Sequence, residues 1–458
     1  MISSISILYL FAINLFCDGD LLDDINKLFK LNLVNEITKN QLTTPTTKNS
    51  QIKKLWRPPS FQLNCDSIMN NDKKYIDEQK KQRFTIDPKE FDLPMDCNSI
   101  KNRAYYPTNP LSKSEKEFPI AYARIVYESY PMIELFFAMS YSPQNHYCYS
   151  VDSKATAMFN KMDALSKCFP NVHLTTRRFD MNSNGDFLPD AHVECMTVLS
   201  KYKFKYLITQ LNDDIHLKTN RETVEILKAM NWPANIRFVE PSPFIKRSID
   251  PKKDWTYGGM KIFHPTDVRS RSKYLSKMKV SHQAGLSSSG LSKEASDYLA
   301  NSLNLTIYLN NLRSGRYASD ELFLQTLMAD SILKVPSWIP KDCLKLYYPT
   351  SAYLMRHINW GNNGSCNSRL SHHTICTNGI EDLHLMKNWK DLLAYRFRVN
   401  QDFGAVICWA EYVYNKQYLH PYQKIDHKYY NNLPQAKYAT NKVSINKLIH
   451  QCRTLKKI

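Results

Sequence analysis

The chain has 458 residues, enough for one large domain or two ordinary ones, and its composition excludes disordered and fibrous proteins. The 61 Lys and Arg against 43 Asp and Glu give a formal net charge of +18, which suits nucleic acid, anionic lipid or a phosphorylated small molecule as partner. No zinc-finger, RRM or KH signature accompanies the basic runs. Most of these runs are therefore expected to be solvated faces, and a nucleic-acid-binding protein is disfavoured.

The N-terminus begins with an uncharged stretch, residues 2–17, that is dominated by Ile, Leu and Phe. This stretch is short for a bilayer span of about 20 residues, and it fits the apolar region of a secretory signal without a basic n-region. For residues 1–18, a cleavable signal and an uncleaved membrane anchor both stay open. Residues 19–117 are interpreted as a stem whose second half, from about residue 61, packs against the main domain.

Eleven cysteines are scattered through the chain, and none forms the C-x-x-C pair of a zinc or redox site. Together with the apolar leader, dispersed cysteines favour structural disulfides in an oxidising compartment. Two sequons agree with such a compartment and mark Asn304 and Asn363 as candidate N-glycosylation sites.

Strand and helix patterns alternate from residue 118 onward. Strands are predicted at 118–127, 146–152, 171–176 and 204–211, and helices at 128–141, 153–169, 191–202 and 220–230. This spacing predicts an α/β domain with a mostly parallel sheet and helices on both faces, extending over about 118–425. Ligands of such sheets bind beyond the carboxyl ends of the strands, where Asp152, Asp213 and Asp214 lie.

The pattern is less regular beyond residue 280. Residues 319–329 are predicted to form a helix with Ser319 as N-cap, and acids in its first turn suit the helix dipole. This stretch alone does not decide whether Asp320 and Glu321 are helix-start charges or catalytic groups. Residues 426–458 are basic and weakly patterned, and a peripheral tail is expected there.

An ordered set of motifs extends from Phe118 to Tyr414. It comprises FPIAYARIVY, SPQNHYCYSVDSKA, LSKCFPNVHL, VECMTVLSKYKFKYLITQ, HLKTN, SDELFLQT, TICTNGIEDL and AYRFRVNQDFGAVICWAEY. In this order they resemble the core-2/I-branching β-1,6-N-acetylglucosaminyltransferases of glycosyltransferase family 14, with the chain as a divergent member.

This resemblance implies a GT-A-like (Rossmann-like) fold with a disulfide-braced C-terminal part, in a type II membrane protein of the Golgi whose catalytic domain is luminal. It implies transfer of a sugar, GlcNAc as the first choice, from a UDP-sugar to a hydroxyl of an O-glycan with formation of a β-1,6 branch. UDP-glucose and UDP-xylose stay open as donors. A carbohydrate-binding relative without turnover is the alternative function.

The resemblance also implies four disulfides. They pair Cys65 with Cys408, Cys97 with Cys168, Cys148 with Cys195, and Cys366 with Cys376. Cys343 and Cys452 are left without an assigned partner.

Glu321 matches the catalytic glutamate of the family. In an inverting transfer the acceptor hydroxyl attacks the anomeric carbon, so one carboxylate acting as general base is needed. A glycosidase would need two carboxylates flanking the bond. Asp320 is interpreted as a supporting residue, and Ser319 stands where the family has proline.

The family is metal-independent and stabilises the leaving diphosphate with basic side chains, so no metal or other cofactor is expected. Arg396 matches a family Lys, with a solvated charge on a helix face as the alternative. His373 matches a family Arg and is charged only when protonated, with an unperturbed pKa of about 6.5. Arg369 or His372 could compensate. Asn212–Asp214 is not a D-x-D motif, and a metal site there is disfavoured.

Three further residues match binding positions of the family. Asp152 matches an aspartate that faces the nucleotide, or it is a helix N-cap. Trp360 matches a tryptophan that lines the acceptor sugar, or it is a buried core residue. Glu240 matches an acceptor-binding acid, while the family tyrosine two residues after the tryptophan is Asn362 here.

Overall fold

The computed structural model describes residues 52–89, 92–315, 317–361, 366–420, 424–441 and 443–455. The architecture below is that of the compact unit from Lys53 onward. The expected signal or anchor, the first part of the expected stem and Asn363 lie outside the described residues. Within the described ranges, the model has no helix with the length and apolar character needed to span a membrane.

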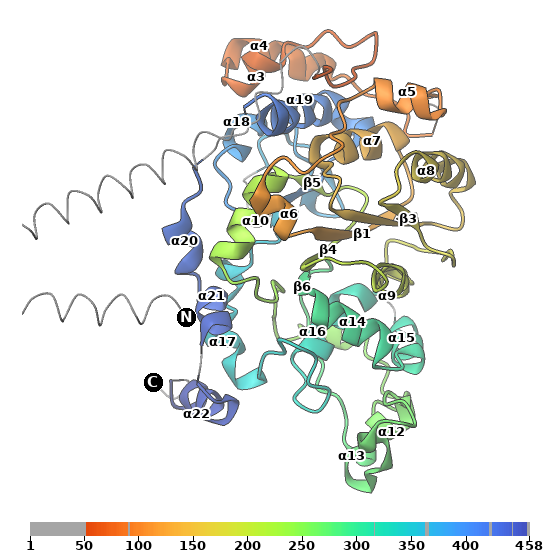
Figure 1. The fold of residues 1–458 in the computed structure, drawn as a ribbon, viewed down its shortest axis with the longest axis vertical. Helices are drawn as coiled ribbons and strands as arrows, with labels where there is room; N and C mark the ends of the chain where they lie inside the picture. The colour runs from red at the N-terminus through yellow and green to blue at the C-terminus, as the bar shows by residue number, and fades with distance from the viewer. Residues whose placement is uncertain are drawn as a thin grey trace, which may run out of the picture. The chain divides into compact units, whose positions relative to one another are not determined.

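The centre of the fold is a five-stranded sheet of order β3-β2-β1-β4-β6 (Figure 1). Its strands are β1 (Ile120–Val126), β2 (His146–Val151), β3 (Val172–Leu174), β4 (Tyr206–Gln210) and β6 (Gly290–Ser292). The first four strands are parallel, and β6 pairs antiparallel with β4. The prediction of a mostly parallel α/β sheet is therefore confirmed.

Helices cover both faces of this sheet. In Figure 1, α7 (Tyr130–Ser140) and α19 (Val399–Tyr418) lie on one side, and α9 (Leu188–Leu199) and α14 (Lys293–Asn301) lie on the other. The central strand β1 is buried along its whole length, as a strand covered on both faces requires. The remaining two helices of the predicted alternation form α8 (Thr156–Cys168) and α10 (Asn220–Ala229).

Shorter elements build the region beyond the carboxyl ends of the strands. A second sheet of order β5-β10-β7 contains β5 (Ile215–His216), β7 (Arg356–Ile358) and β10 (Leu393–Tyr395), and a hairpin joins β8 (Ser371–His372) to β9 (Ile375–Cys376). Further helices of the unit are α11 (Pro243–Lys246), α12 (Tyr257–Met260), α13 (Lys273–Lys277), α15 (Thr306–Arg313), α16 (Ser319–Met328), α17 (Leu344–Tyr347) and α18 (Leu383–Met386).

Disulfides connect distant parts of this unit. The structure contains the four pairs that the resemblance implies and joins the two unassigned cysteines, Cys343 and Cys452, to each other. The expected stem contributes α3 (Cys65–Met69), α4 (Lys73–Gln79), α5 (Cys97–Asn102) and α6 (Lys113–Glu117). Two of the disulfides, Cys65–Cys408 and Cys97–Cys168, attach it to the rest of the unit.

The expectation of a peripheral tail at residues 426–458 is wrong. They form α20 (His427–Asn431), α21 (Pro434–Thr440) and α22 (Ile445–Leu455). Leu448 and Cys452 of α22 are buried in the hydrophobic core cluster. Apolar residues at 445, 448, 449 and 452 follow the i, i+3, i+4, i+7 spacing of an amphipathic helix, a pattern that the basic composition of the segment conceals.

Candidate active site

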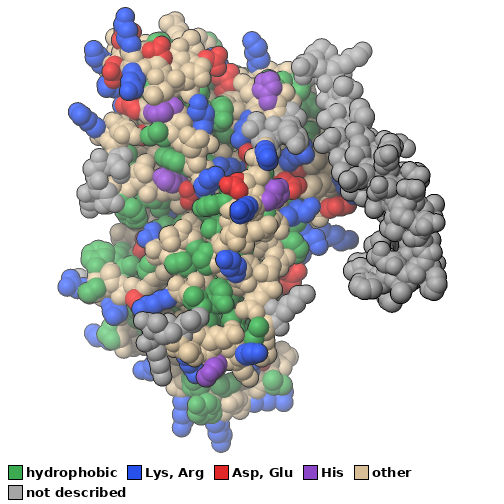
Figure 2. Space-filling model, turned by 90° about the vertical axis from the view of Figure 1, so that its left-hand side faces the viewer, with side chains coloured by type: hydrophobic (Ala, Val, Ile, Leu, Met, Phe, Trp, Pro, Cys, Tyr) green, Lys and Arg blue, Asp and Glu red, His purple; other side chains and the backbone are tan. Residues whose placement is uncertain are grey.

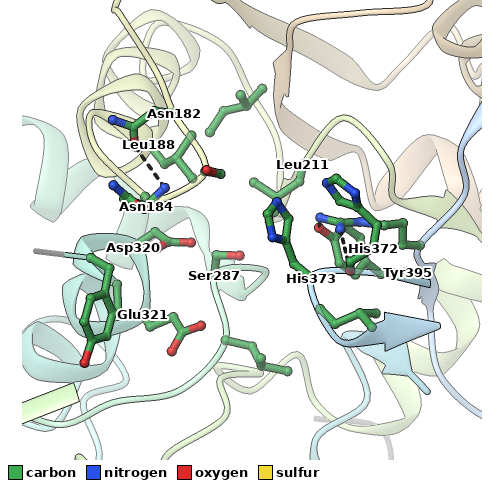
Figure 3. Close-up of a pocket in the computed structure, with 18 of the residues that line it drawn as sticks. Asn182, Asn184, Leu188, Leu211, Ser287, Asp320, Glu321, His372, His373 and Tyr395 are labelled. Carbon is green, nitrogen blue, oxygen red and sulfur yellow. Dashed lines mark hydrogen bonds between the residues drawn. The ribbon is translucent and has the colours of Figure 1, made fainter. Parts of the chain in front are cut away.

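A cavity of about 600 Å³ lies beyond the carboxyl ends of β1 and β2. Five of the predicted site residues line it, namely Asp152, Glu321, Trp360, His373 and Arg396. Figure 3 shows Asp320 and Glu321 on one side and His372, His373 and Tyr395 on the other. The topology thus brings the ends of the central strands, the start of α16 and the β8–β9 hairpin to one place.

The carboxylates are placed by an unusual start of α16. The N-cap is Ala318, with a left-handed φ of 64°, so the prediction of Ser319 as N-cap is wrong. The Ser319 hydroxyl instead donates to the Gly185 carbonyl oxygen at 2.5 Å, and the Ala318 N–H donates to Asn184 O at 2.7 Å. These bonds tie the loop before α9 to the helix that carries Asp320 and Glu321.

Asp320 and Glu321 are only partly exposed and both line the cavity. Burial raises the pKa of the Asp320 carboxyl. Burial also raises the pKa of the Glu321 carboxyl, and the neighbouring charge of Asp320 raises it further, against the lowering effect of Arg237 and Arg356. A carboxylate with a raised pKa is a stronger proton acceptor, as a general base needs to be.

Two arginines face the cavity from the segment after β10. Arg396 is 8% exposed and Arg398 is also largely buried, so a solvated helix face is the wrong interpretation of Arg396. Asp213 forms an ion pair with each of them. Its Oδ2 lies 3.3 Å from Arg396 Nε and 3.6 Å from Arg398 Nη1. Glu128 Oε1 lies 3.1 Å from Arg398 Nη2. Hydrogen bonds from Arg398 to Glu128 and from Arg396 to the His372 carbonyl oxygen orient the two guanidinium groups, and Asp213 adds the nearby negative charge.

Two carboxylates of the Asn212–Asp214 run pair with the arginines of the site. Asp213 holds the two arginines, while Asp214 Oδ2 accepts from Arg356 Nη2 at 2.6 Å. Burial raises the pKa of the Asp213 carboxyl even beside these positive charges. Both carboxylates therefore face guanidinium groups.

The two histidines of the hairpin differ in their surroundings. Burial, together with the charges of Arg398 and Arg396, lowers the pKa of His372 to about 4, so this ring is neutral at pH 7. His372 therefore does not compensate as a cation, but its backbone oxygen accepts a hydrogen bond from Arg396 at 3.0 Å. His373 is exposed at the cavity and its ring packs against His372 at 4.1 Å. Arg369 is exposed and does not line the cavity.

Asp152 follows β2 directly and is 6% exposed. It is not the N-cap of α8, because that helix begins at Thr156 after Ala155. Its Oδ1 accepts from the Lys154 N–H at 2.9 Å, and its Oδ2 lies 3.4 Å from Lys154 Nζ. The carboxylate is thus held in a turn at the floor of the cavity.

Aromatic side chains form part of the cavity wall. Trp360 is 36% exposed and pairs with Ile375 in an isolated bridge, so the buried-core interpretation is wrong. Phe244, which is 61% exposed, stacks on Tyr317 with ring centroids 4.0 Å apart. Glu240 is exposed and is not among the described residues that line the cavity.

Sequence reasoning missed Arg398, Arg356 and the Phe244–Tyr317 pair. A signal existed for Arg398, because side chains two residues apart in extended backbone share a face. Arg396 and Arg398 alternate with Phe397, which is fully buried. The other side chains come from separate loops, and no local pattern indicates that they meet.

Comparisons with known proteins show the family of the chain. The core-2/I-branching enzyme family matches residues 120–387. The chain is 26% identical over 436 residues to a beta-1,3-galactosyl-O-glycosyl-glycoprotein beta-1,6-N-acetylglucosaminyltransferase 3 of Ovis aries, covering 88% of this chain and 91% of that protein.

Similar relatives occur in a virus and in human. A beta-1,3-galactosyl-O-glycosyl-glycoprotein beta-1,6-N-acetylglucosaminyltransferase of Bovine herpesvirus 4 is 25% identical over 425 residues, covering 87% of this chain and 90% of that protein. The N-acetyllactosaminide beta-1,6-N-acetylglucosaminyl-transferase of Homo sapiens is 28% identical over 323 residues, covering 66% of this chain and 74% of that protein. The family match spans more than half of the sequence, and its members are glycosyltransferases. The chain therefore belongs to the core-2/I-branching enzyme family and is a glycosyltransferase.

Proposed function

We propose that this chain transfers GlcNAc from UDP-GlcNAc to a hydroxyl of an O-glycan with inversion, forming a β-1,6 branch. The observation that carries the proposal is one cavity that Glu321, Arg396 and Arg398 all line. Figure 3 shows Glu321 across from His372, whose carbonyl oxygen accepts from Arg396. A base on one side and fixed cations on the other are the two groups that this reaction needs. The names of the relatives support the choice of donor sugar and acceptor.

In the proposed step, Glu321 accepts the proton of the acceptor hydroxyl while its oxygen bonds to the anomeric carbon of the donor. The bond between that carbon and the phosphate oxygen breaks at the same time, and UDP leaves with the electron pair. Attack from the face opposite UDP inverts the anomeric centre. The general base is worth roughly a hundredfold to ten-thousandfold in rate.

Arg396 and Arg398 are proposed to stabilise the charge that develops on the leaving diphosphate, with no divalent metal. Guanidinium groups suit this role, because they are always charged and donate two bonds in one plane. His373 adds hydrogen bonding at the same wall. Asp152 is proposed to contact the nucleotide, and Trp360 is proposed to pack against a sugar of the acceptor. Glu240 has weaker support because it lies outside the cavity wall.

We also propose that the enzyme works in the lumen of the Golgi. The five disulfides support an oxidising compartment. Asn304 is part of a sequon and is half-buried, with its Oδ1 accepting from the Thr306 N–H at 3.2 Å.

The test is release of UDP by the purified chain with a core O-glycan disaccharide as acceptor. UDP-GlcNAc, UDP-glucose and UDP-xylose are compared with EDTA present throughout. Glu321→Gln should lose roughly a hundredfold or more of turnover, while UDP binding measured by calorimetry changes little. Glu294→Gln, at an exposed carboxylate on α14, is the matched control and should keep full activity.

Each outcome has a defined meaning. Normal turnover of Glu321→Gln would refute the base assignment, and loss of activity in EDTA that metal restores would refute the metal-free account. A folded protein that binds the glycan without turning over any donor would favour the carbohydrate-binding alternative.

A further inference from the structure

The chain between α11 and α14 contains a strongly basic segment. Residues 252–279 contain eight Lys and Arg against two Asp. Six of these cations are exposed in two runs, which we call the basic strip: Lys252, Lys253, Arg271, Lys273, Lys277 and Lys279. The glycosyl transfer proposed above uses none of them.

The fold pairs the segment that follows the first run with the end of the second run. The Val280 N–H donates to Trp255 O at 3.1 Å, and the Tyr257 N–H donates to Met278 O at 2.9 Å. An isolated bridge pairs Thr256 with Lys279. The residues that flank each run are thereby joined, although about twenty residues separate the runs in the chain. Figure 2 shows blue side chains gathered at the lower end of the molecule, at the height where Figure 1 places α12 and α13.

The fold leaves most cations of the basic strip without a paired acid. Hydrogen bonds from Thr256 lower the pKa of the Asp254 carboxyl, and the charge of Lys279 lowers it further. No salt bridge joins any of the six to an acid among the described residues. Asp267 is paired with Arg269, which is outside the strip. Asp254 is exposed, and its Oδ1 accepts from the Thr256 N–H. Clustered like charges repel one another, so the strip has charge available for an anionic partner.

The position of the strip indicates which partner it fits. It follows α11, whose Phe244 and Ile245 line the cavity. Phe244 stacks on Tyr317 at the cavity, and further along the chain the Asp254 carbonyl oxygen accepts from Asn311 Nδ2 of α15 at 2.9 Å. The chain that leads to the strip therefore follows the end of α15 away from the cavity. Two large side chains beside it are exposed, Tyr274 at 75% and Val268 at 78%. A charged surface that the chain reaches directly from the cavity wall suits the polypeptide that carries the acceptor, whereas attachment to a membrane would not require this continuity.

We propose that the basic strip binds an acidic segment of the polypeptide that carries the acceptor glycan. This inference rests on the proposed function and extends it from the reacting sugar to the protein around it. Exposed carboxylates of the partner gain favourable interaction with several lysines at once, and the gain decreases with salt. The enzyme is thereby selective for glycans next to acidic sequence.

The test compares two glycopeptides that carry the same O-linked disaccharide. One has four Glu beside the glycan and the other has four Gln. The strip variant changes Lys252, Lys253, Lys273 and Lys277 to Gln. The control variant changes Lys73, Lys74, Lys81 and Lys116 to Gln, which removes the same charge from exposed positions near the N-terminus of the unit.

The strip variant should lose roughly tenfold in kcat/KM for the acidic glycopeptide, as four exposed ion pairs would give. Its kcat/KM for the neutral glycopeptide should stay unchanged, and the control variant should behave as wild type. Equal loss with both peptides, or equal loss in the control variant, would overturn the proposal. So would a wild type without preference for the acidic peptide at low salt.

Two further measurements separate the possible failures. Fluorescence anisotropy with labelled glycopeptides measures binding without turnover. An inactive chain that still prefers the acidic peptide would refute the proposed glycosyl transfer and support the proposed role of the basic strip. Sedimentation with vesicles of phosphatidylserine and phosphatidylcholine tests a membrane partner. Strip-dependent binding to vesicles without any preference among the peptides would overturn the proposal and assign the strip to anionic lipid.

Discussion

At the scale of single residues, the site contains two neighbouring carboxyls, Asp320 and Glu321. Ionising both at once is unfavourable, because they are partly buried and their charges repel. Burial raises the pKa of Asp320 and of Glu321, and the charge on Asp320 raises that of Glu321 further. Arg356 opposes both shifts and is itself held by Asp214. The pKa of the proposed base is therefore set by its neighbour on the helix and by a buried arginine from β7.

This coupling predicts a pH dependence. Glu321 must be deprotonated to act as base, and a raised pKa keeps it protonated to higher pH, so kcat/KM should fall on acidification earlier than for an ordinary carboxyl. Asp320→Asn removes the like charge and lowers the pKa of Glu321. The acid limb of the profile should therefore move to lower pH in this variant.

The measurement is kcat/KM from pH 5 to 9 for wild type and Asp320→Asn, with thermal unfolding at each pH as a check of folding. An acid limb that stays in place would show that Asp320 does not tune the base. A limb that moves to higher pH would contradict the sign of the coupling.

At the scale of elements, the sequence predicted what local patterns control. The alternating strands and helices from residue 118 to 230 are present because apolar runs of strand length alternate with periods of 3.6 residues. Asp152 was correctly placed at a strand end for the same reason. The start of α16 was misread, because Ala318 adopts positive φ and frees Ser319 to bond to a loop more than 130 residues away. Such tertiary hydrogen bonds leave no local signal.

Gly185 in that loop supports a prediction at the same scale. Its φ is +94°, and a Cβ there would lie 2.3 Å from Asp320 Oδ1. Gly185→Ala must strain the backbone, at about 1–2 kcal/mol, and must displace the carboxylate as well. We expect the free energy of unfolding to decrease by about 1–3 kcal/mol and kcat/KM to decrease with it.

Urea unfolding and steady-state kinetics measure these two effects. Ser183→Ala, at an exposed residue of the same loop, is the control and should leave stability unchanged. A Gly185→Ala protein with wild-type stability and activity would show that the contact between loop and helix does not hold Asp320.

At the scale of the whole described unit, four of the five disulfides connect parts of the fold that are distant in the sequence, and the fifth closes the hairpin at the cavity. Cys343–Cys452 has a sequence separation of 109 and fastens α22 to the core, where neither cysteine lines the cavity. Cys366–Cys376 has a separation of 10 and encloses the hairpin that carries His372 and His373. The first pairing was not anticipated, since cysteine positions alone do not determine connectivity.

Removal of the first disulfide should mainly lower stability, and removal of the second should mainly lower activity. In the chain-entropy account, a bond that closes a loop of about 100 residues contributes about 4.7 kcal/mol, and one that closes about 15 residues contributes about 3 kcal/mol. Cys343→Ser with Cys452→Ser should therefore lower the melting temperature more, yet keep kcat/KM at temperatures where the protein is folded. Cys366→Ser with Cys376→Ser should melt closer to wild type and lose activity, because Arg396 donates to the His372 carbonyl of the released hairpin. Thermal unfolding and kinetics on both double variants measure the contrast, and a variant of the hairpin with full activity would show that this wall of the cavity keeps its position without the bond.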